Sequence, residues 1–290
     1  MKYAVYVEGK AEMLFVADVL CKYSKYDPTR LGFCCINLVA DSSNLVSYPR
    51  QGDPDTSRDY YQIVNVNNDN KVISKLSKDI PNLTAKGFQV IIGLRDVFSK
   101  NYTDIYPEQK IDYANITAFC KPQTMALDMV KTSSDVRLHF AIMEFETWML
   151  ALINKYIDAK GMQVHDIEQQ LNITLSSCNN YETLAFHPYN LVRKILGCCG
   201  EKYGKHGDEL QSFLSCLQWE DYEELLNSNL CPSYTKFIVM FTKYRKQSKS
   251  GNYLKAIFSR LNQSSKLRTA TKRLEHFYGS VHLKTTNFLA

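Results

Sequence analysis

Acidic residues follow three of the strands that the sequence predicts. They are Glu8 after residues 3–7, Asp96 after residues 88–94, and Glu144 and Glu146 after residues 136–142. The carboxyl ends of parallel strands meet at one rim of a sheet, where open α/β sheets place their sites. Carboxylates gathered there repel one another unless a cation lies among them, and Mg²⁺ is the usual cation with oxygen ligands. The alternative is that each acid only caps the helix that follows its strand.

Charge is unevenly distributed along the chain. Residues 1–150 hold 17 Lys and Arg against 18 Asp and Glu, whereas residues 151–290 hold 18 against 12. The segment 236–284 has 12 basic residues and one acidic residue, interleaved with Phe and Tyr. Such a segment is typical of a surface that binds DNA or RNA, and we expect Lys243, Arg245 and Lys246 to contact it. The alternative is a solvated helical surface over a small aromatic core.

Composition excludes several classes of protein. The chain has 290 residues, of which 45% are hydrophobic and 22% charged, so it is neither disordered nor of low complexity. No apolar run approaches the roughly 20 residues of a membrane helix, and the first residues do not form a signal peptide. The nine cysteines include two adjacent pairs that suit neither zinc nor a redox motif. We therefore expect reduced cysteines, a cytoplasmic location and no membrane partner.

The proposed rim requires a parallel sheet, and the hydrophobic pattern predicts one. Strands are expected at residues 3–7, 33–39, 60–66, 88–94 and 136–142, and helices at 13–23, 70–85, within 108–131 and at 145–157. The run 88–94 is apolar throughout, which is typical of a strand buried on both faces. Loops are expected in the polar stretches after residues 39 and 96. This alternation predicts an α/β domain over residues 1–155, with a mainly parallel sheet flanked by helices.

The rest of the chain has few strand signals. Helical patterns are expected at residues 189–197, 207–218, 220–227, 232–246 and 252–263. Residues 156–290 are therefore expected to form a basic helical domain.

Three motifs resemble, in their order, those of Toprim-fold proteins. They are Glu8-Gly9-Lys10-Ala11-Glu12, Ile91-Ile92-Gly93-Leu94-Arg95-Asp96 and Glu144-Phe145-Glu146-Thr147-Trp148. The chain is most similar to OLD-type and RloB-like nucleases and to small Toprim-like proteins of bacterial anti-phage loci. Two later elements, Tyr203-Gly204-Lys205 and Cys231-Pro232-Ser233-Tyr234, resemble parts of their helical tails.

The resemblance implies a role for each acidic residue. Glu8 would act as general acid and base or as a metal ligand, and Asp96 would be a principal metal ligand. Glu146, with Glu144 beside it, would supply the third acid of the site, although only one of these two need bind metal. Glu12 would orient Glu8 or join the metal cluster, with a solvated acid in the first helical turn as the alternative.

Basic residues around these motifs would contact phosphate. The resemblance implies this for Lys10, close to a helix N-terminus that favours anions, and for Lys205. Arg95 adjoins the site and either binds phosphate or neutralises the acids. Trp148 lies in an apolar helical run, which favours core packing over base stacking.

One position departs from the family pattern. Many Toprim proteins carry Asp-x-Asp at the middle motif, whereas Phe98 stands at the third position here. One ligand is then either missing or supplied elsewhere, by Asp104 or Asp112. The departure leaves one-metal hydrolysis, or no hydrolysis, open.

The resulting hypothesis is an endonuclease that depends on Mg²⁺ or Mn²⁺ and acts in anti-phage defence. A non-catalytic or latent Toprim subunit that binds nucleic acid or an ATPase partner is the second hypothesis. Transfer of a nucleotidyl group is a third.

Overall fold

The computed structural model describes residues 1–39, 42–45, 50–68, 71–204 and 209–243. Backbone contacts divide the chain into two units, Met1–Ile238 and Val239–Ala290. The first unit contains the sheet and almost all of the described helices. The domain boundary that the sequence predicts at residue 155 stays a prediction.

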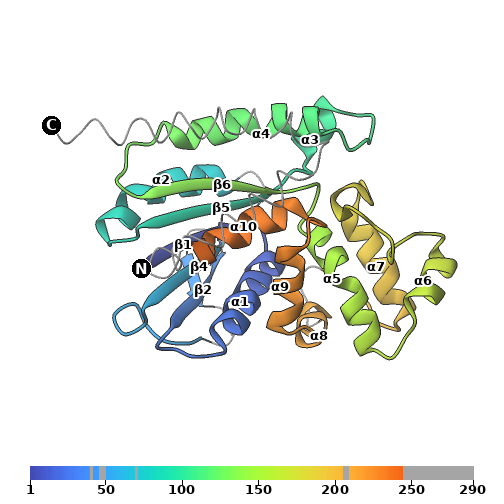
Figure 1. The fold of residues 1–290 in the computed structure, drawn as a ribbon. Coiled ribbons are helices and arrows are strands. Elements are labelled where there is room, and N and C mark those ends of the chain that lie inside the picture. The colour runs from blue at the N-terminus through green and yellow to red at the C-terminus, as the bar shows by residue number, and fades with distance from the viewer. Residues whose placement is uncertain (40–41, 46–49, 69–70, 205–208, 244–290) are drawn as a thin grey trace. The chain divides into compact units, whose positions relative to one another are not determined.

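A six-stranded sheet lies at the centre of the first unit, in the order β3-β2-β4-β1-β5-β6 (Figure 1). The strands are β1 (Lys2–Val7), β2 (Leu31–Val39), β3 (Ser42–Leu45), β4 (Asp59–Asn65), β5 (Val90–Asp96) and β6 (Asp135–Ala141). Five strands are parallel, and β3 pairs antiparallel with β2 at the edge. The predicted α/β fold with a mainly parallel sheet is therefore confirmed.

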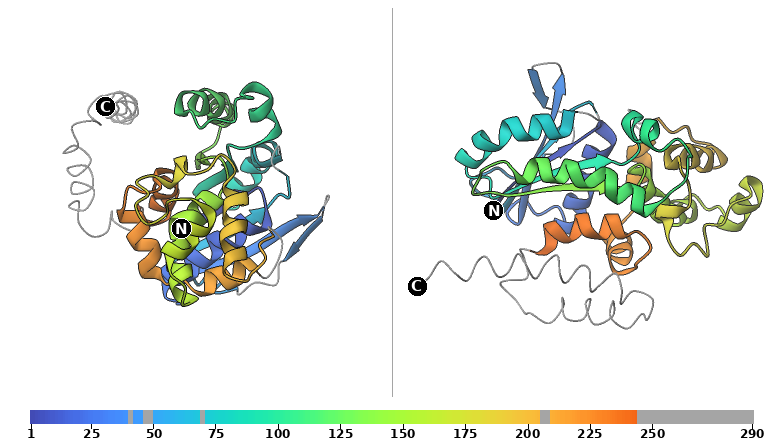
Figure 2. Two further views of the ribbon diagram at one scale, coloured as in Figure 1. Left: turned by 90° about the vertical axis from the view of Figure 1, so that its right-hand side faces the viewer. Right: turned by 90° about the horizontal axis from the view of Figure 1, so that it is seen from above.

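Helices cover both faces of the sheet. α1 (Lys10–Ser24) packs on one face, and α2 (Lys71–Ala85) and α4 (Tyr113–Asp128) pack on the other (Figure 1; Figure 2). Every residue of β5 is buried, as expected for a central strand between two helical layers. Gly93 in β5 faces α2 closely, because a Cβ at this position would lie 3.3 Å from the Leu76 side chain.

A helical region follows the sheet. Its helices are α5 (Glu146–Ala159), α6 (Val164–Leu171), the 3₁₀ helix η1 (Tyr181–Thr183), α7 (Pro188–Cys198), α8 (Glu209–Ser215), α9 (Trp219–Asn227) and α10 (Pro232–Lys243). Polar contacts tie α8 and α9 to α1. The buried Lys22 ammonium donates to the Leu214 carbonyl at 2.5 Å, and Tyr222 donates to the Asp18 carboxylate at 2.7 Å. Up to Ile238, these helices belong to the same compact unit as the sheet.

Two loop predictions are wrong. The stretch after residue 39 contains β3, whose backbone pairs with β2 without an apolar pattern of its own. The stretch after residue 96 contains α3 (Lys100–Ile105), where the Ser99 hydroxyl accepts a hydrogen bond from the Tyr102 backbone nitrogen. The helix predicted at 252–263 lies outside the described residues.

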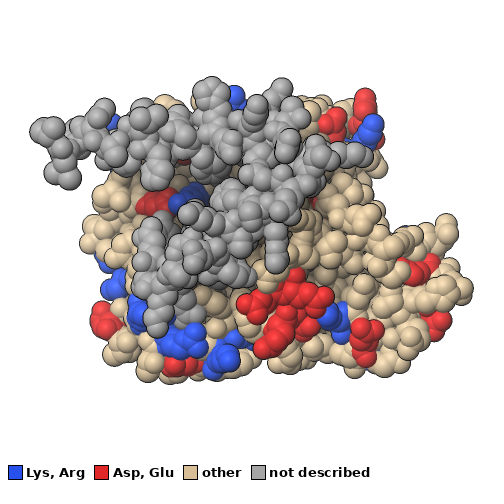
Figure 3. Space-filling model, viewed as in Figure 1, with Lys and Arg blue, Asp and Glu red and all other residues tan. Residues whose placement is uncertain are grey.

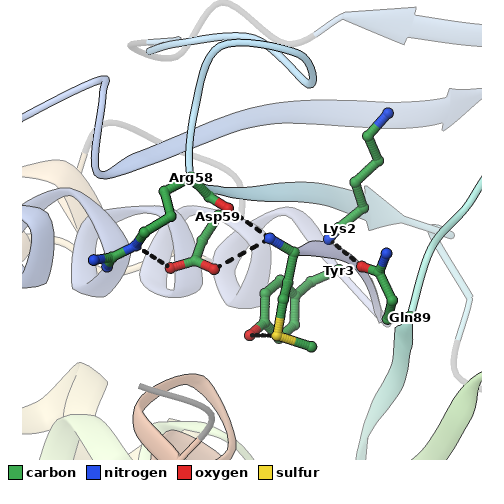
Figure 4. A network of polar contacts seen from close by, with 6 residues as sticks. Lys2, Tyr3, Arg58, Asp59 and Gln89 are labelled. Carbon is green, nitrogen blue, oxygen red and sulfur yellow. Dashed lines mark hydrogen bonds and ion pairs between the residues drawn. The ribbon is translucent and has the colours of Figure 1, made fainter. Parts of the chain in front are cut away.

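Short contacts anchor β1 at the rim away from Glu8 (Figure 4). The Met1 backbone nitrogen contacts the carboxylate of Asp59, the first residue of β4, at 3.4 Å. On the other side, the Lys2 backbone nitrogen donates to the Gln89 side chain at 2.6 Å, just before β5. These contacts link the start of β1 to both neighbouring strands, with which β1 pairs in parallel register.

Candidate functional site

Three neighbouring strands end in acids at one rim of the sheet. Glu8 follows β1, Asp96 is the last residue of β5, and Glu144 follows β6 by three residues. The register aligns these ends, because Tyr6 pairs with Gly93 and Asp96 pairs with Ala141. All three carboxylates are buried. The structure therefore brings the predicted acids to a single rim.

Glu8 is paired with Arg95 inside the protein. The Arg95 Nε atom donates to Glu8 Oε1 at 2.9 Å, and both side chains are only 6% exposed. Arg95 also donates through Nη1 to the side chain of Gln123 on α4. Of the two roles expected for Arg95, neutralising an acid is the one observed. Gln123 had no signal in the sequence, because only the packing of α4 on β6 brings it to the rim.

Strand geometry directs Arg95 and Asp96 to opposite faces of β5. Side chains alternate between the two faces of a strand, so Arg95 shares the face of Gly93, towards α2, and Asp96 takes the opposite face. Tyr6 also lies on the α2 face, where its hydroxyl donates to Asp79, and Glu8 follows it by two residues. Arg95 and Asp96 therefore lie on opposite faces of β5 at the rim, and Glu8, which follows the last residue of β1, pairs with Arg95.

Glu146 and Glu12 gather around Tyr203. Glu146, the first residue of α5, is fully buried, and its Oε1 accepts a hydrogen bond from the Tyr203 hydroxyl at 3.1 Å. Burial raises the pKa of Tyr203 well above its usual value, and the nearby charges of Glu146 and Glu12 raise it further. Tyr203 therefore stays protonated and keeps its hydrogen bond to Glu146. The sequence pointed to Tyr203 by resemblance alone and gave no role for it.

Glu12 folds back over the start of α1. A Cβ at Gly9 would lie 2.7 Å from Glu12 Oε2, so a larger residue there would require the Glu12 carboxylate to shift. A carboxylate at this place is stabilised by the helix dipole. Lys10 is the first residue of the same helix and is partly exposed.

Glu144 is held by the helical region. Its Oε2 accepts a hydrogen bond from the Tyr189 backbone nitrogen at 2.8 Å, at the beginning of α7. The preceding residue, Met143, has a left-handed backbone with φ of 61°, which turns the chain from β6 towards α5. Glu144 and Glu146 thus have different hydrogen-bond partners, as expected from their separation by one residue.

The two residues expected to substitute for the missing middle ligand make other contacts in the structure. Asp104 pairs with Lys100 at 2.7 Å, and Asp112 accepts a hydrogen bond from the Ala114 backbone nitrogen at the start of α4. Phe98 packs its ring against Phe186 and His187, with ring centroids 5.8 Å and 4.5 Å apart. An apolar contact therefore stands where many Toprim proteins have a ligand.

The described residues contain no group of three or more His, Cys, Asp or Glu side chains that could hold a metal ion. The rim therefore does not fit an ion enclosed by protein ligands alone. Mg²⁺ is often held by one or two carboxylates together with substrate phosphates. Asp96, the carboxylate that ends β5, has the chemistry that this second mode needs.

Several predicted phosphate contacts lie outside the described residues, namely Lys205, Arg245 and Lys246. Lys243 ends α10, and its side chain is likewise outside the described part. Trp148 is fully buried and donates to the Ser233 hydroxyl at 2.9 Å, so it is a core residue as predicted.

Acidic side chains gather over α9 in the view of Figure 3. Glu220, Glu223 and Glu224 are exposed on this helix. Such a face repels phosphate groups, which disfavours nucleic acid there.

No family model, curated protein or solved structure matches this chain. Among the described helices, none has the length and apolar character needed to cross a membrane.

Proposed function

We propose that this chain is a Toprim-like nuclease that uses Mg²⁺ or Mn²⁺ to hydrolyse phosphodiester bonds in DNA or RNA. The observation that carries the proposal is the meeting of Glu8, Asp96 and Glu144 at the ends of three adjacent parallel strands. Burial of three acids at one rim is costly, which favours a functional reason for it.

Each residue at the rim would have its own role in the reaction. A bound divalent ion supplies an activated water and offsets charge on the phosphate. Asp96 would hold that ion together with substrate phosphates, and Glu8 would move protons once it is released from Arg95. Lys10, at the start of α1, would contact a phosphate.

The proposal is tested with purified protein, Mg²⁺ or Mn²⁺, and single- and double-stranded DNA and RNA. Glu8→Gln and Asp96→Asn are expected to lower the cleavage rate by about 100-fold or more, as for a lost proton carrier or metal ligand. Glu220→Gln, on the exposed face of α9, is the matched control and should cleave as the wild type does. Equal cleavage by all four proteins would reject the proposed site.

The contacts of the acids at the rim favour a second function. Glu8 is neutralised by Arg95, and the described residues hold no three-residue metal group. The chain would then be a non-catalytic or latent subunit that binds nucleic acid or an ATPase partner. A latent nuclease would be silent alone and would cleave when its partner is added, whereas a binding subunit would retain nucleic acid and never cleave it.

The role in anti-phage defence and the cytoplasmic location belong to this proposal. The first follows from the resemblance of the motifs. The second is supported by the cysteines, since all nine are free, as is usual in a reducing compartment.

A further inference from the structure

A cavity of about 700 Å³ lies between α2, α3 and α4, on the face of the sheet towards which Arg95 points. Pockets for small molecules commonly measure about 300–1,000 Å³. The cavity adjoins the acidic rim, but most of its lining residues belong to α2, α3 and α4 and not to the strands. None of the roles proposed above uses it.

Arg95 is the cationic group of this cavity. Its Nε and Nη1 atoms donate to Glu8 and to Gln123, which are both acceptors inside the protein. A guanidinium carries five N–H groups. Within the described part of the chain its Nη2 group makes no hydrogen bond, so it can donate to a ligand. Arginine binds phosphate with two parallel hydrogen bonds, which a ligand in this cavity could complete.

The walls of the cavity suit an organic ligand. Phe119 and Tyr106 provide aromatic surface, and both are only partly buried. Asn101 and Asp104 lie at the exposed side, where they can accept hydrogen bonds from hydroxyl or amino groups. A ligand with a phosphate at one end, a planar body and several hydroxyl groups matches these features.

We propose that this cavity binds a nucleoside monophosphate, whose phosphate competes with Glu8 for the Arg95 guanidinium. Binding would weaken the ion pair and free the Glu8 carboxylate. The proposal does not depend on a bound metal or on nuclease activity, because it concerns only Arg95, its two protein partners and the cavity walls.

Calorimetry of the full chain with AMP, in buffer that contains EDTA, tests the site. We expect saturable one-to-one binding, with adenosine and inorganic phosphate each binding at least about tenfold more weakly. Adenosine as tight as AMP would overturn the role of Arg95. Inorganic phosphate as tight as AMP would overturn the role of the aromatic wall, and no saturable AMP binding would overturn the site.

Two matched substitutions on α4 test the location. Ala118 lines the cavity, whereas Ala126 is exposed on the same helix and does not line it. Ala118→Trp should weaken AMP binding by about tenfold or more, and Ala126→Trp should leave it unchanged. Equal binding by the two variants would place AMP elsewhere.

Glu8→Gln tests the competition separately from catalysis. Because Gln carries no charge, the Arg95 guanidinium would be freer to bind phosphate, and AMP should bind about three- to tenfold more tightly. Circular dichroism shows whether the variant is folded. Unchanged or weaker binding by folded Glu8→Gln would overturn the competition.

Discussion

Arg95 Nε lies 2.9 Å from Glu8 Oε1, at the rim where three parallel strands end. The next residue along β5, Asp96, takes the opposite face of the sheet. The end of β5 therefore places a cation on one face of the sheet and a carboxylate on the other. Arg95 thus neutralises Glu8, and the Asp96 carboxylate lies on the face of β5 opposite to Arg95.

The Glu8–Arg95 pair should be important for folding. Arg95→Met removes the guanidinium and leaves the buried Glu8 carboxylate without its cation, which costs about 3–5 kcal/mol. The double variant Glu8→Gln with Arg95→Met should recover most of this loss. Urea unfolding of the wild type, both single variants and the double variant measures the coupling.

The exposed Lys100–Asp104 pair is the matched control for that experiment. Its side chains are 83% and 59% exposed, so Lys100→Met should change the free energy of unfolding by only about 0–1 kcal/mol. Equal losses for Arg95→Met and Lys100→Met would contradict the importance of burial.

Tyr203 should stabilise the buried Glu146. Tyr203→Phe keeps the ring and removes the hydroxyl that donates to Glu146 Oε1, at a cost of about 1–3 kcal/mol. Tyr26→Phe, at a residue that is 61% exposed, should leave the free energy of unfolding unchanged. Thermal or urea unfolding compares the two, and a stable Tyr203→Phe would show that Glu146 does not need this donor.

His139 should make stability fall in mild acid. Burial lowers the pKa of His139 to about 4, and the charges of Arg137 and Lys236 add to the effect while Asp135 opposes it. Because the folded pKa lies below the unfolded value of 6.5, the stabilisation is complete above pH 6.5 and is lost as the pH falls towards 4.

The contribution of His139 is separated by replacing it with Leu. The urea midpoint of the wild type should fall more between about pH 7 and pH 5 than that of His139→Leu, because the variant has no imidazole to protonate. An equal fall of the urea midpoint in the two proteins would show that other groups cause the pH dependence of stability.

The sequence predicted the strands and the acids at their ends. It did not predict which residues those acids contact. β1 and β5 are apolar runs buried on both faces, so these strands and the acids at their ends were visible in the sequence. The sequence did not predict β3 because its residues are polar. Only the pairing of its backbone with β2 makes it a strand. The partners of the acids, Gln123, Tyr189 and Tyr203, come from distant elements, and no local pattern marks a contact made only by packing.

Strand alternation explains why the sequence did not predict the pairing of Glu8 with Arg95. The sequence placed Glu8 and Asp96 at one rim, and the register of β1 and β5 agrees. The residue of each strand that meets α2 depends on the packing of the sheet, and the contacts of Gly93 and Tyr6 show it in the folded structure. Arg95 therefore shares the face of α2, and Asp96 does not.

The most direct test of the central claim is a crystal of the full chain soaked in Mn²⁺ with a short oligonucleotide. The account predicts an anomalous peak about 2.2 Å from a carboxylate oxygen of Asp96, with phosphate oxygens completing the shell. The same crystal of Asp96→Asn should lose the peak. A peak that persists in Asp96→Asn, or bound oligonucleotide with no metal near Asp96, would contradict the account.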